Sequence, residues 1–362
     1  MSSLSFGRCA LGRIPALVAL ALCVVMLACA TLRAAAQPGN TLPPKVAALI
    51  PAAKQEGELV IFGQALNPGQ VQAVSQALGA FYGFPIKLSL VVGLHVAKAA
   101  EVVDAAQHGV PSGLDVFWTT AENIETLSKG GALAPFDWTK ALDIDPALKF
   151  SEYGLKSHDG VLSNVLYNTS LVKAAEAPRS YKDLLDPKWR GRIAMPRSPG
   201  PWVNLSYALG EDETARILDA LIHQQQAKLL PTYPDVKARV ISGEFPIGIG
   251  PDVFVEAAQG APVANADLNL TALAPWAFAL LKDARHPALA KLWGYWAVST
   301  EGQRTLDRLR GLALVSSPGT YVAKYAQGKD GQNRHLRLYG EEFRQAEPTL
   351  RANYGNRSLI FR

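Results

Sequence analysis

Hydrophobic residues along the chain form short continuous runs that alternate with segments of helical spacing. The first runs lie at residues 58–62, 86–92 and 114–118. Runs of this length are typical of strands buried in a parallel sheet. Apolar spacing predicts helices around them, at residues 45–57, 71–82, 96–107 and 121–127. Strands and helices that alternate in this order predict an open α/β sheet with a parallel core.

The middle of the chain repeats this alternation, which predicts a second α/β sheet. Strands are expected at 161–168, 192–195 and 245–249, and helices at 181–189, 215–226 and 235–241. Residues 270–281 form a long apolar segment interrupted by Pro275, as expected where a chain crosses between two lobes. Residues 288–309 have the spacing of one or two amphipathic helices.

The first 36 residues have the pattern of a secretory signal. Arg8 and Arg13 precede an apolar run at 16–32, and Ala34–Ala36 supply a small-residue cleavage site. A single membrane anchor is one alternative, because about 17 residues is the lower limit for crossing a bilayer. Lipid attachment at Cys29 is another. The pattern favours cleavage, which predicts a periplasmic protein.

Removal of this segment changes the composition of the chain. All three cysteines lie within it, so the remaining 326 residues form neither a disulfide nor a thiolate metal site. Three arginines and no acidic residue are also removed, which lowers the formal net charge from +5 to +2. This small charge argues against nucleic acid as a partner. A chain of 326 residues exceeds the usual size of one domain.

Eight motifs occur along the chain in a fixed order. They lie at residues 57–62, 113–118, 127–133, 165–171, 180–196, 242–250, 260–263 and 285–291. Together they resemble the extracellular solute-binding proteins of bacterial ABC importers, in the type 2 branch that includes the periplasmic ferric-iron-binding proteins. The resemblance covers residues 45–320. It implies two α/β lobes joined by crossing strands, with a small ligand enclosed between them by hinge motion. It also implies a membrane permease and an ATPase as partners.

The resemblance divides the chain into four parts. We expect a signal peptide at 1–36, a discontinuous first lobe at 41–165 and 275–325, a second lobe at 166–274, and a C-terminal tail at 326–362. The sequence gives no placement for the tail. We expect the protein to be a monomer.

Ferric iron is one ligand that the resemblance raises. Iron-binding members of the family hold the ion with a consecutive tyrosine pair after the strand that corresponds to 245–249, and often with a glutamate further upstream. Residues 250–255 contain no tyrosine, and the upstream position falls near Ala105. His95 and Asp252 alone make a poor site for a hard trivalent cation. We therefore expect no metal site and no cofactor, and a ferric-iron-binding protein is the alternative function.

Ligand contacts are expected in the loops after the strands, because ligands bind beyond the carboxyl ends of strands in open α/β sheets. The candidates are Gln64, Asn67, Trp118, Thr119, Thr120, Tyr167, Arg197, Ser198, Asp252 and Trp276. Arg197 and Ser198 precede a predicted helix, where guanidinium, hydroxyl and backbone N–H groups can bind an oxyanion. We expect Tyr167 to line the cleft.

Several candidates also have a purely structural interpretation. Ser198 and Asp252 can cap the helices that follow them, and Arg197 can be a solvated loop charge. Trp118 can be an ordinary core residue, and Trp276 can pack at the hinge.

No common catalytic motif is present, since the chain lacks a nucleophile elbow, a P-loop, a dinucleotide-binding glycine motif and a zinc-protease motif. We therefore predict a binding protein rather than an enzyme. Its solute is expected to be a small organic or oxyanionic compound, held by Arg197 and Ser198 in one lobe and Trp118 and Thr119 in the other. A ligand-sensing protein of the same fold stays open as an alternative.

Overall fold

The computed structural model describes residues 42–327 except 163, 199 and 251, and the short stretches 334–337, 346, 349–350 and 352–353. The described residues from 43 onward belong to one compact unit. The expected signal peptide at 1–36 lies outside the described residues. No helix in the described part of the chain combines the length and the apolar character needed to cross a membrane.

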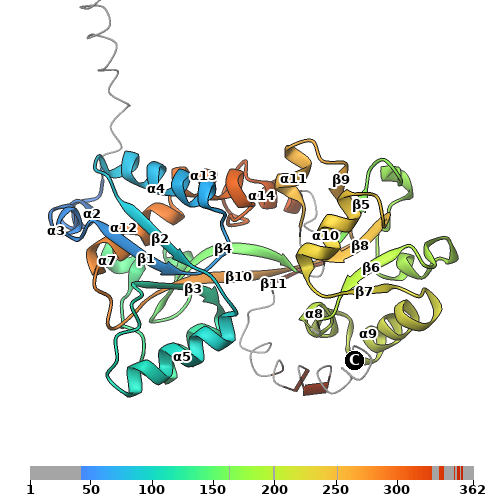
Figure 1. Ribbon diagram of the computed structural model, residues 1–362, viewed down its shortest axis with the longest axis horizontal. Helices are drawn as coiled ribbons and strands as arrows, with labels where there is room; N and C mark the ends of the chain where they lie inside the picture. The colour runs from blue at the N-terminus through green and yellow to red at the C-terminus, as the bar shows by residue number, and fades with distance from the viewer. Residues whose placement is uncertain are drawn as a thin grey trace, which may run out of the picture. The chain divides into compact units, whose positions relative to one another are not determined.

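A six-stranded mixed sheet forms the centre of the first lobe (Figure 1). Its strands are β1 (Glu58–Phe62), β2 (Lys87–Val91), β3 (Val116–Thr120), β4 (Gly154–Leu162), β10 (Leu270–Leu280) and β11 (Arg334–Arg337). Strand β1 lies between β2 and β3 and is parallel to both. Strand β10 is antiparallel to both β3 and β4. The three expected strands of the first half are confirmed.

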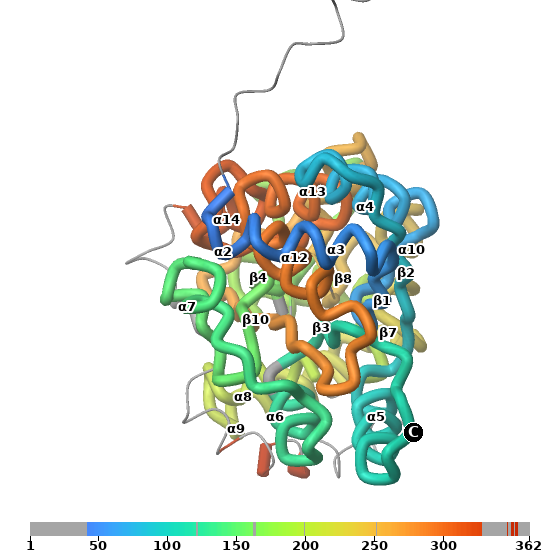
Figure 2. The backbone as a smooth tube through the Cα atoms, turned by 90° about the vertical axis from the view of Figure 1, so that its left-hand side faces the viewer, coloured from blue at the N-terminus to red at the C-terminus, as the bar shows by residue number. Residues whose placement is uncertain are grey.

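Helices cover both faces of this sheet, which explains why its strands are continuous apolar runs. They are α2 (Pro44–Ala47), α3 (Ile50–Glu56), α4 (Pro68–Tyr82), α5 (His95–Gln107), α6 (Ala121–Lys129), α7 (Trp138–Leu142), α12 (Pro287–Val298), α13 (Thr300–Arg310) and α14 (Tyr321–Ala326). Figure 2 shows α5 and α6 on one side of the strands and α3, α4, α12 and α13 on the other. Phe62 and Phe117 pack against α5 and α6, whereas Phe278 meets Trp293 of α12.

A five-stranded sheet in the order β7-β6-β8-β5-β9 forms the centre of the second lobe. Its strands are β5 (Asn164–Asn168), β6 (Ile193–Pro196), β7 (Lys228–Leu230), β8 (Ile247–Gly250) and β9 (Val263–Asn265). Its helices are α8 (Gly200–Leu209), α9 (Glu211–Asp219), α10 (Tyr233–Ile241) and α11 (Phe254–Ala258). Trp202 of α8 and Leu218 of α9 pack on one face, and Val236 and Val240 of α10 pack on the other.

Strands β4 and β10 connect the two sheets (Figure 1). They pair with each other over most of their length, and β4 leads directly toward β5 of the second sheet. The expected crossing segment at 270–281 is confirmed as β10. Pro275 does not interrupt this strand. It lies opposite Asp159 of β4, and pairing with β3 begins only at Trp276, so the missing N–H of Pro275 removes no bond to β3.

Other elements differ from the sequence-based expectation. The strand expected at 161–168 is the end of β4 followed by β5, and β4 begins at Gly154. The helix expected at 181–189 is a pair of 3-10 turns, Lys182–Leu185 and Pro187–Trp189, because Pro187 lacks the N–H that a continuous helix needs. In the tail, β11 pairs with β10, and Leu350 packs in the core of the second lobe.

Candidate ligand-binding site

The carboxyl edge of the first sheet carries polar and aromatic side chains beside the crossing strands. Gln64 follows β1, and His95 follows the loop after β2. Strand β10 brings Trp276 opposite Thr120, the last residue of β3. Residues far apart in the sequence therefore meet at the edge where ligands bind in open α/β sheets.

Four rings form an aromatic cluster at this edge, made of Trp118, Trp276, His95 and His158. Trp276 stacks on His158 with ring centroids 5.3 Å apart and an interplanar angle of 20°. Trp276 also meets His95 edge to face at 5.2 Å, and Trp118 meets His158 in the same way at 5.5 Å. Trp118 and His158 are buried, whereas Trp276 and His95 are half-buried. The accessible part of the cluster is therefore formed by Trp276 and His95.

The two imidazoles of the cluster are uncharged at neutral pH. Burial, and to a lesser extent the nearby charge of Arg310, lowers the pKa of His158 to about 3. Burial also lowers the pKa of His95. The Nε1 group of Trp118 donates to Ser157 Oγ at 2.9 Å and to His158 Nδ1 at 3.3 Å, which fixes the buried half of the cluster. The edge thus presents a neutral ring surface.

The hydroxyl groups expected to contact the ligand are engaged within the first lobe. Thr119 is completely buried, and its Oγ1 lies 3.0 Å from His95 Nδ1 and accepts from Asn123 Nδ2 at 3.0 Å. Thr120 Oγ1 donates to Glu122 Oε2 at 2.6 Å. Trp118 is only 1% exposed, so it has the core position that was the structural alternative. These residues support the site, and Trp276 and His95 form its surface.

The loop after β1 contains a buried side-chain donor, that of Gln64. Gln64 Nε2 is buried and has no hydrogen-bond acceptor among the residues that the structure describes. Asn67 is engaged in a capping box at the start of α4, where its Oδ1 accepts from Gln70 N at 2.9 Å. Gly63 lies against Trp118, because a Cβ at this position would come within 2.8 Å of Trp118 Cβ. This close approach fixes the loop on the aromatic cluster.

A run of exposed apolar residues borders His95. Val92, Leu94 and Val96 are 54%, 81% and 76% exposed. Large apolar side chains gathered around a loop in this way are uncommon on a surface that contacts only water. The surface next to the aromatic cluster is therefore suited to carbon-rich groups.

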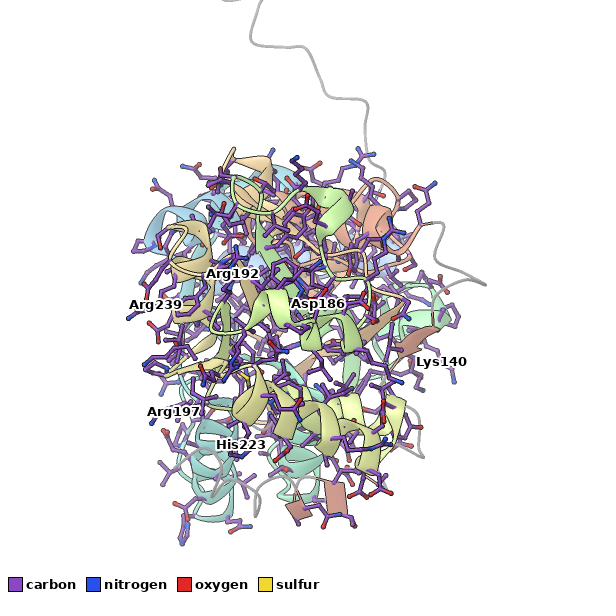
Figure 3. All side chains as sticks on the ribbon, turned by 90° about the vertical axis from the view of Figure 1, so that its right-hand side faces the viewer. Lys140, Asp186, Arg192, Arg197, His223 and Arg239 are labelled. Carbon is purple, nitrogen blue, oxygen red and sulfur yellow. The ribbon has the colours of Figure 1, made fainter. Side chains whose placement is uncertain are left out.

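The carboxyl edge of the second sheet carries Arg197 and Ser198 after β6. Arg197 is exposed, and Figure 3 labels it among the charged side chains of this lobe. Ser198 Oγ accepts from Gly200 N at 3.3 Å at the start of α8, so the capping interpretation of Ser198 is supported. The Tyr233 hydroxyl also lies close to this helix start, 3.6 Å from the position that a Cβ on Gly200 would take.

Asp252 and Tyr167 are the remaining candidates in the second lobe. The Phe254 N–H acts on the Asp252 carboxylate and lowers its pKa, but the N-cap residue of α11 is Val253 and there is no side-chain cap hydrogen bond, so the interpretation of Asp252 as the cap is not supported. Burial raises the pKa of Asp252, and the charges of Lys237 and Arg310 oppose this effect. The expectation that Tyr167 lines the cleft is not met, since its ring lies in the core of the second lobe and is 7% exposed. Alternation along β5 points Tyr167 to the same side as the buried Val165.

Arg310 was not recognised from the sequence. It is the last residue of α13, and the preceding carbonyl, of Leu309, accepts from Gln70 Nε2 at 2.6 Å. The following Gly311 lies beside Asp252, whose Oδ1 is 3.4 Å from the position of a Gly311 Cβ. The end of α13 thus lies where the loop after β1 meets the loop after β8. No local motif indicates this position.

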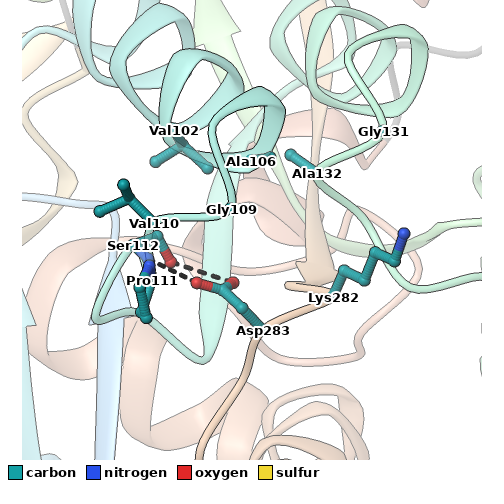
Figure 4. A pocket seen from close by; sticks show the side chains of 10 residues that line it. All are labelled: Val102, Ala106, Gly109, Val110, Pro111, Ser112, Gly131, Ala132, Lys282 and Asp283. Carbon is teal, nitrogen blue, oxygen red and sulfur yellow. Dashed lines mark hydrogen bonds between the residues drawn. The ribbon is translucent and has the colours of Figure 1, made fainter.

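Other surface features lie apart from these edges. Figure 4 shows a pocket of about 310 Å³ at the opposite end of the first sheet, lined by Val102, Val110, Pro111, Ala132 and Lys282 among others. Asp283 closes one side of it by accepting from the backbone and hydroxyl of Ser112. Among the described residues, no group of three His, Cys, Asp or Glu side chains is arranged to hold a metal ion.

Comparison with protein families shows the family to which the chain belongs. The model of the family "bacterial extracellular solute-binding protein" matches residues 82–323. The chain belongs to this family. It is therefore one of the bacterial extracellular solute-binding proteins. No curated protein sequence matches the chain.

Solved structures of other solute-binding proteins share the fold. The substrate-binding protein of an ABC transporter from Agrobacterium tumefaciens is 17% identical, with a TM-score of 0.65 over 84% of this chain and 95% of that one. Iron-bound HitA from Pseudomonas aeruginosa is 16% identical, with a TM-score of 0.60 over 82% and 99%. AfuA from Actinobacillus pleuropneumoniae, with fructose-6-phosphate bound, is 19% identical, with a TM-score of 0.57 over 83% and 97%. These similarities confirm the expected type 2 periplasmic binding fold.

Proposed function

We propose that this solute-binding protein captures a small organic anion between its two lobes and delivers it to a membrane permease and its ATPase. The observation that carries the proposal is the placement of two complementary edges beside the crossing strands. The first lobe presents Trp276, His95 and the Nε2 group of Gln64, which has no acceptor among the described residues. The second lobe presents Arg197, Ser198 and the start of α8. A ring surface opposite guanidinium, hydroxyl and backbone donors suits an anion with a carbon skeleton.

Capture is proposed to occur by hinge motion in β4 and β10. Our proposed division places the first lobe at 41–165 and 275–325 and the second lobe at 166–274, so that these two strands carry the bending. We also propose that residues 1–36 direct export to the periplasm, that the protein acts as a monomer, and that it binds its solute without converting it.

Ferric iron is disfavoured by the ligands available. Residues 250–255 contain no tyrosine. Burial raises the pKa of Asp252, which disfavours its ionised form, and His95 interacts with Thr119. The iron that HitA holds and the sugar phosphate that AfuA holds therefore serve only as probes for this chain.

Thermal-shift and calorimetric screening of the purified protein tests the proposal. The panel contains carboxylates, phosphonates, sugar phosphates, spermidine and ferric citrate. We expect one class of organic anion to raise the unfolding temperature, because a ligand at a hundred times its Kd stabilises the folded state by about 2.7 kcal/mol. The radius of gyration measured by X-ray scattering should fall with the same compound.

Arg197→Gln tests the proposed contact between Arg197 and the anion. Arg192→Gln is its control, because it also removes an exposed arginine from the second lobe. Removing a charged donor from the bound anion should weaken binding by about tenfold or more for Arg197→Gln. Tight ferric binding with a charge-transfer colour, together with no response to any anion, would show that the proposal is wrong.

A further inference from the structure

Arg310 has an unusual environment for an arginine. Its side chain is half-buried, and it makes no hydrogen bond or ion pair with any residue that the structure describes. A guanidinium carries five N–H donors, and withdrawing them from water without an acceptor is costly. Arg308, two residues earlier on the same helix, is exposed and needs no partner. The Arg310 guanidinium is therefore partly withdrawn from water and can bind an acceptor that the protein does not supply.

The position of Arg310 places that charge at the candidate site. Its neighbour Leu309 is bonded to Gln70 at the start of α4, and its neighbour Gly311 lies against Asp252. The charge of Arg310 acts on both His158 and Asp252. The ring of His158 also stacks on Trp276, so Arg310 acts electrostatically on the residue that supports Trp276.

Few acceptor groups of the protein compete with an external anion for the Arg310 guanidinium. Asp252 is a nearby carboxylate, and burial raises its pKa, which disfavours its ionised form. His158 is neutral and buried. Gln64 adds a second donor without an acceptor in the described part of the chain. A guanidinium can donate to a carboxylate or a phosphonate through two N–H groups.

The surface beside this charge favours a flat, carbon-rich group. Trp276 is supported from one side by His158 and bordered by His95, so that its ring is held in a fixed orientation. Aromatic rings prefer stacked or edge-to-face contacts with other rings. The exposed Val92 and Leu94 extend the apolar surface next to His95.

We infer that the solute is an aromatic anion, whose charged group pairs with Arg310 and whose ring lies against Trp276. This inference rests on the proposed function and names the class of solute within it.

Calorimetry with a matched set of small probes tests the inference on the full chain. Benzoate and phenylphosphonate are aromatic anions, benzamide has the same ring without charge, benzylamine has the opposite charge, and cyclohexanecarboxylate has the charge without the aromatic ring. We expect benzoate or phenylphosphonate to bind at least tenfold more tightly than the other three probes. Arg310→Gln should weaken binding of the anion by about 10- to 100-fold and change that of benzamide by less than threefold. Arg308→Gln, the control, should stay within twofold of the unaltered protein.

Trp276→Leu tests the second half of the inference. This variant should bind benzoate and cyclohexanecarboxylate with equal affinity, because the preference for a flat ring depends on the indole. A preference that survives the substitution contradicts the assignment of Trp276.

Other results separate this inference from the proposed function. If fructose 6-phosphate or an aliphatic carboxylate stabilises the protein and no aromatic anion does, the inference is wrong and the proposed capture of an organic anion stands. If Arg310→Gln and Asp252→Asn weaken the binding of benzoate and of benzamide by the same factor, Arg310 stabilises the contact between the lobes. Its assignment as the partner of the anion is then wrong. If no solute of any class stabilises the protein, the proposed function itself fails.

Discussion

The indole of Trp276 stacks on the imidazole of His158, with ring centroids 5.3 Å apart and planes 20° from parallel. The two residues face each other across the pair of strands, β10 and β4, that connects the lobes. The ladder between these strands shifts its register directly after Trp276. A buried neutral ring therefore supports a half-buried indole at the position where the chain passes from one lobe to the other.

Burial of His158 makes the stability of the protein depend on acid pH. Its pKa is lowered from 6.5 to about 3 by burial and secondarily by the charge of Arg310. Between these values the unfolded state binds a proton that the folded state does not, so the free energy of unfolding falls as the pH falls from 6.5. One such proton contributes a slope of about 1.4 kcal/mol per pH unit. Urea unfolding of His158→Gln at several pH values should show a slope smaller by this amount.

His223→Gln is the control for that measurement, because the His223 side chain is 64% exposed. Curves for His158→Gln and the unaltered protein that run parallel from pH 7 to pH 4 would contradict the prediction.

Asp307 should produce a pH dependence of the opposite sign. Burial raises its pKa from 3.8 to about 6, although the backbone N–H of Tyr321 opposes the shift. Between these values the folded state holds more proton than the unfolded state, so the stabilisation present below pH 3.8 is lost as the pH rises through 6. Asp307→Asn cannot ionise. Its unfolding free energy relative to the unaltered protein should therefore increase from pH 4 to pH 7, and a constant difference would exclude this role for Asp307.

Asn67 tests whether a loop residue acts in binding or in folding. Its side chain caps α4 by accepting from Gln70 N, and Gln70 Oε1 accepts from Asn67 N in return. Asn67→Ala should lower the free energy of unfolding by about 1 kcal/mol, whereas Asn67→Asp should keep the cap. Calorimetry with the solute should give the same Kd for all three proteins. A selective loss of affinity in both variants would instead make Asn67 a ligand contact.

Gly294 tests the packing of α12 against α7. A Cβ at this position would come 2.7 Å from Trp138 Cε3 and closer still to Trp138 Cζ3, and the Trp138 side chain is 1% exposed. Gly294→Ala should therefore lower the free energy of unfolding by about 1–3 kcal/mol in urea titrations. Gly69→Ala in α4 is the matched control, because its nearest neighbouring atom, Asn67 Oδ1, lies at 3.4 Å. Equal stability of the two variants would show that Trp138 moves aside freely.

The fold could be predicted where buried elements have a recognisable pattern of apolar residues. Strands β1, β2 and β3 lie within one or two residues of the apolar runs at 58–62, 86–92 and 114–118, because helices cover both faces of their sheet. Strands β7 and β9 have three residues each, which is too short for any periodicity to be recognised.

The candidate site could be predicted only in part. Gln64 and Trp276 could be named as candidates because they follow or lie within clear apolar segments. Tyr167 was misplaced because its polar tip suggested an exposed position, while the alternation along β5 turns its ring into the core. His158 and Arg310 lie in segments without any recognised motif, and their role depends on neighbours more than fifty residues away in the sequence.

The sequence by itself determined the alternation of strands and helices, the two α/β lobes, the crossing segment at 270–281 and the family. Each of these is recorded in the spacing of apolar residues or in short motifs, since the burial of one element shapes its own composition. Only the tertiary structure decided that His158 supports Trp276, that Thr119 is enclosed and that Arg310 reaches the junction of two loops. Strands β4 and β10 carry the chain between the two sheets, and this path sets which distant side chains meet.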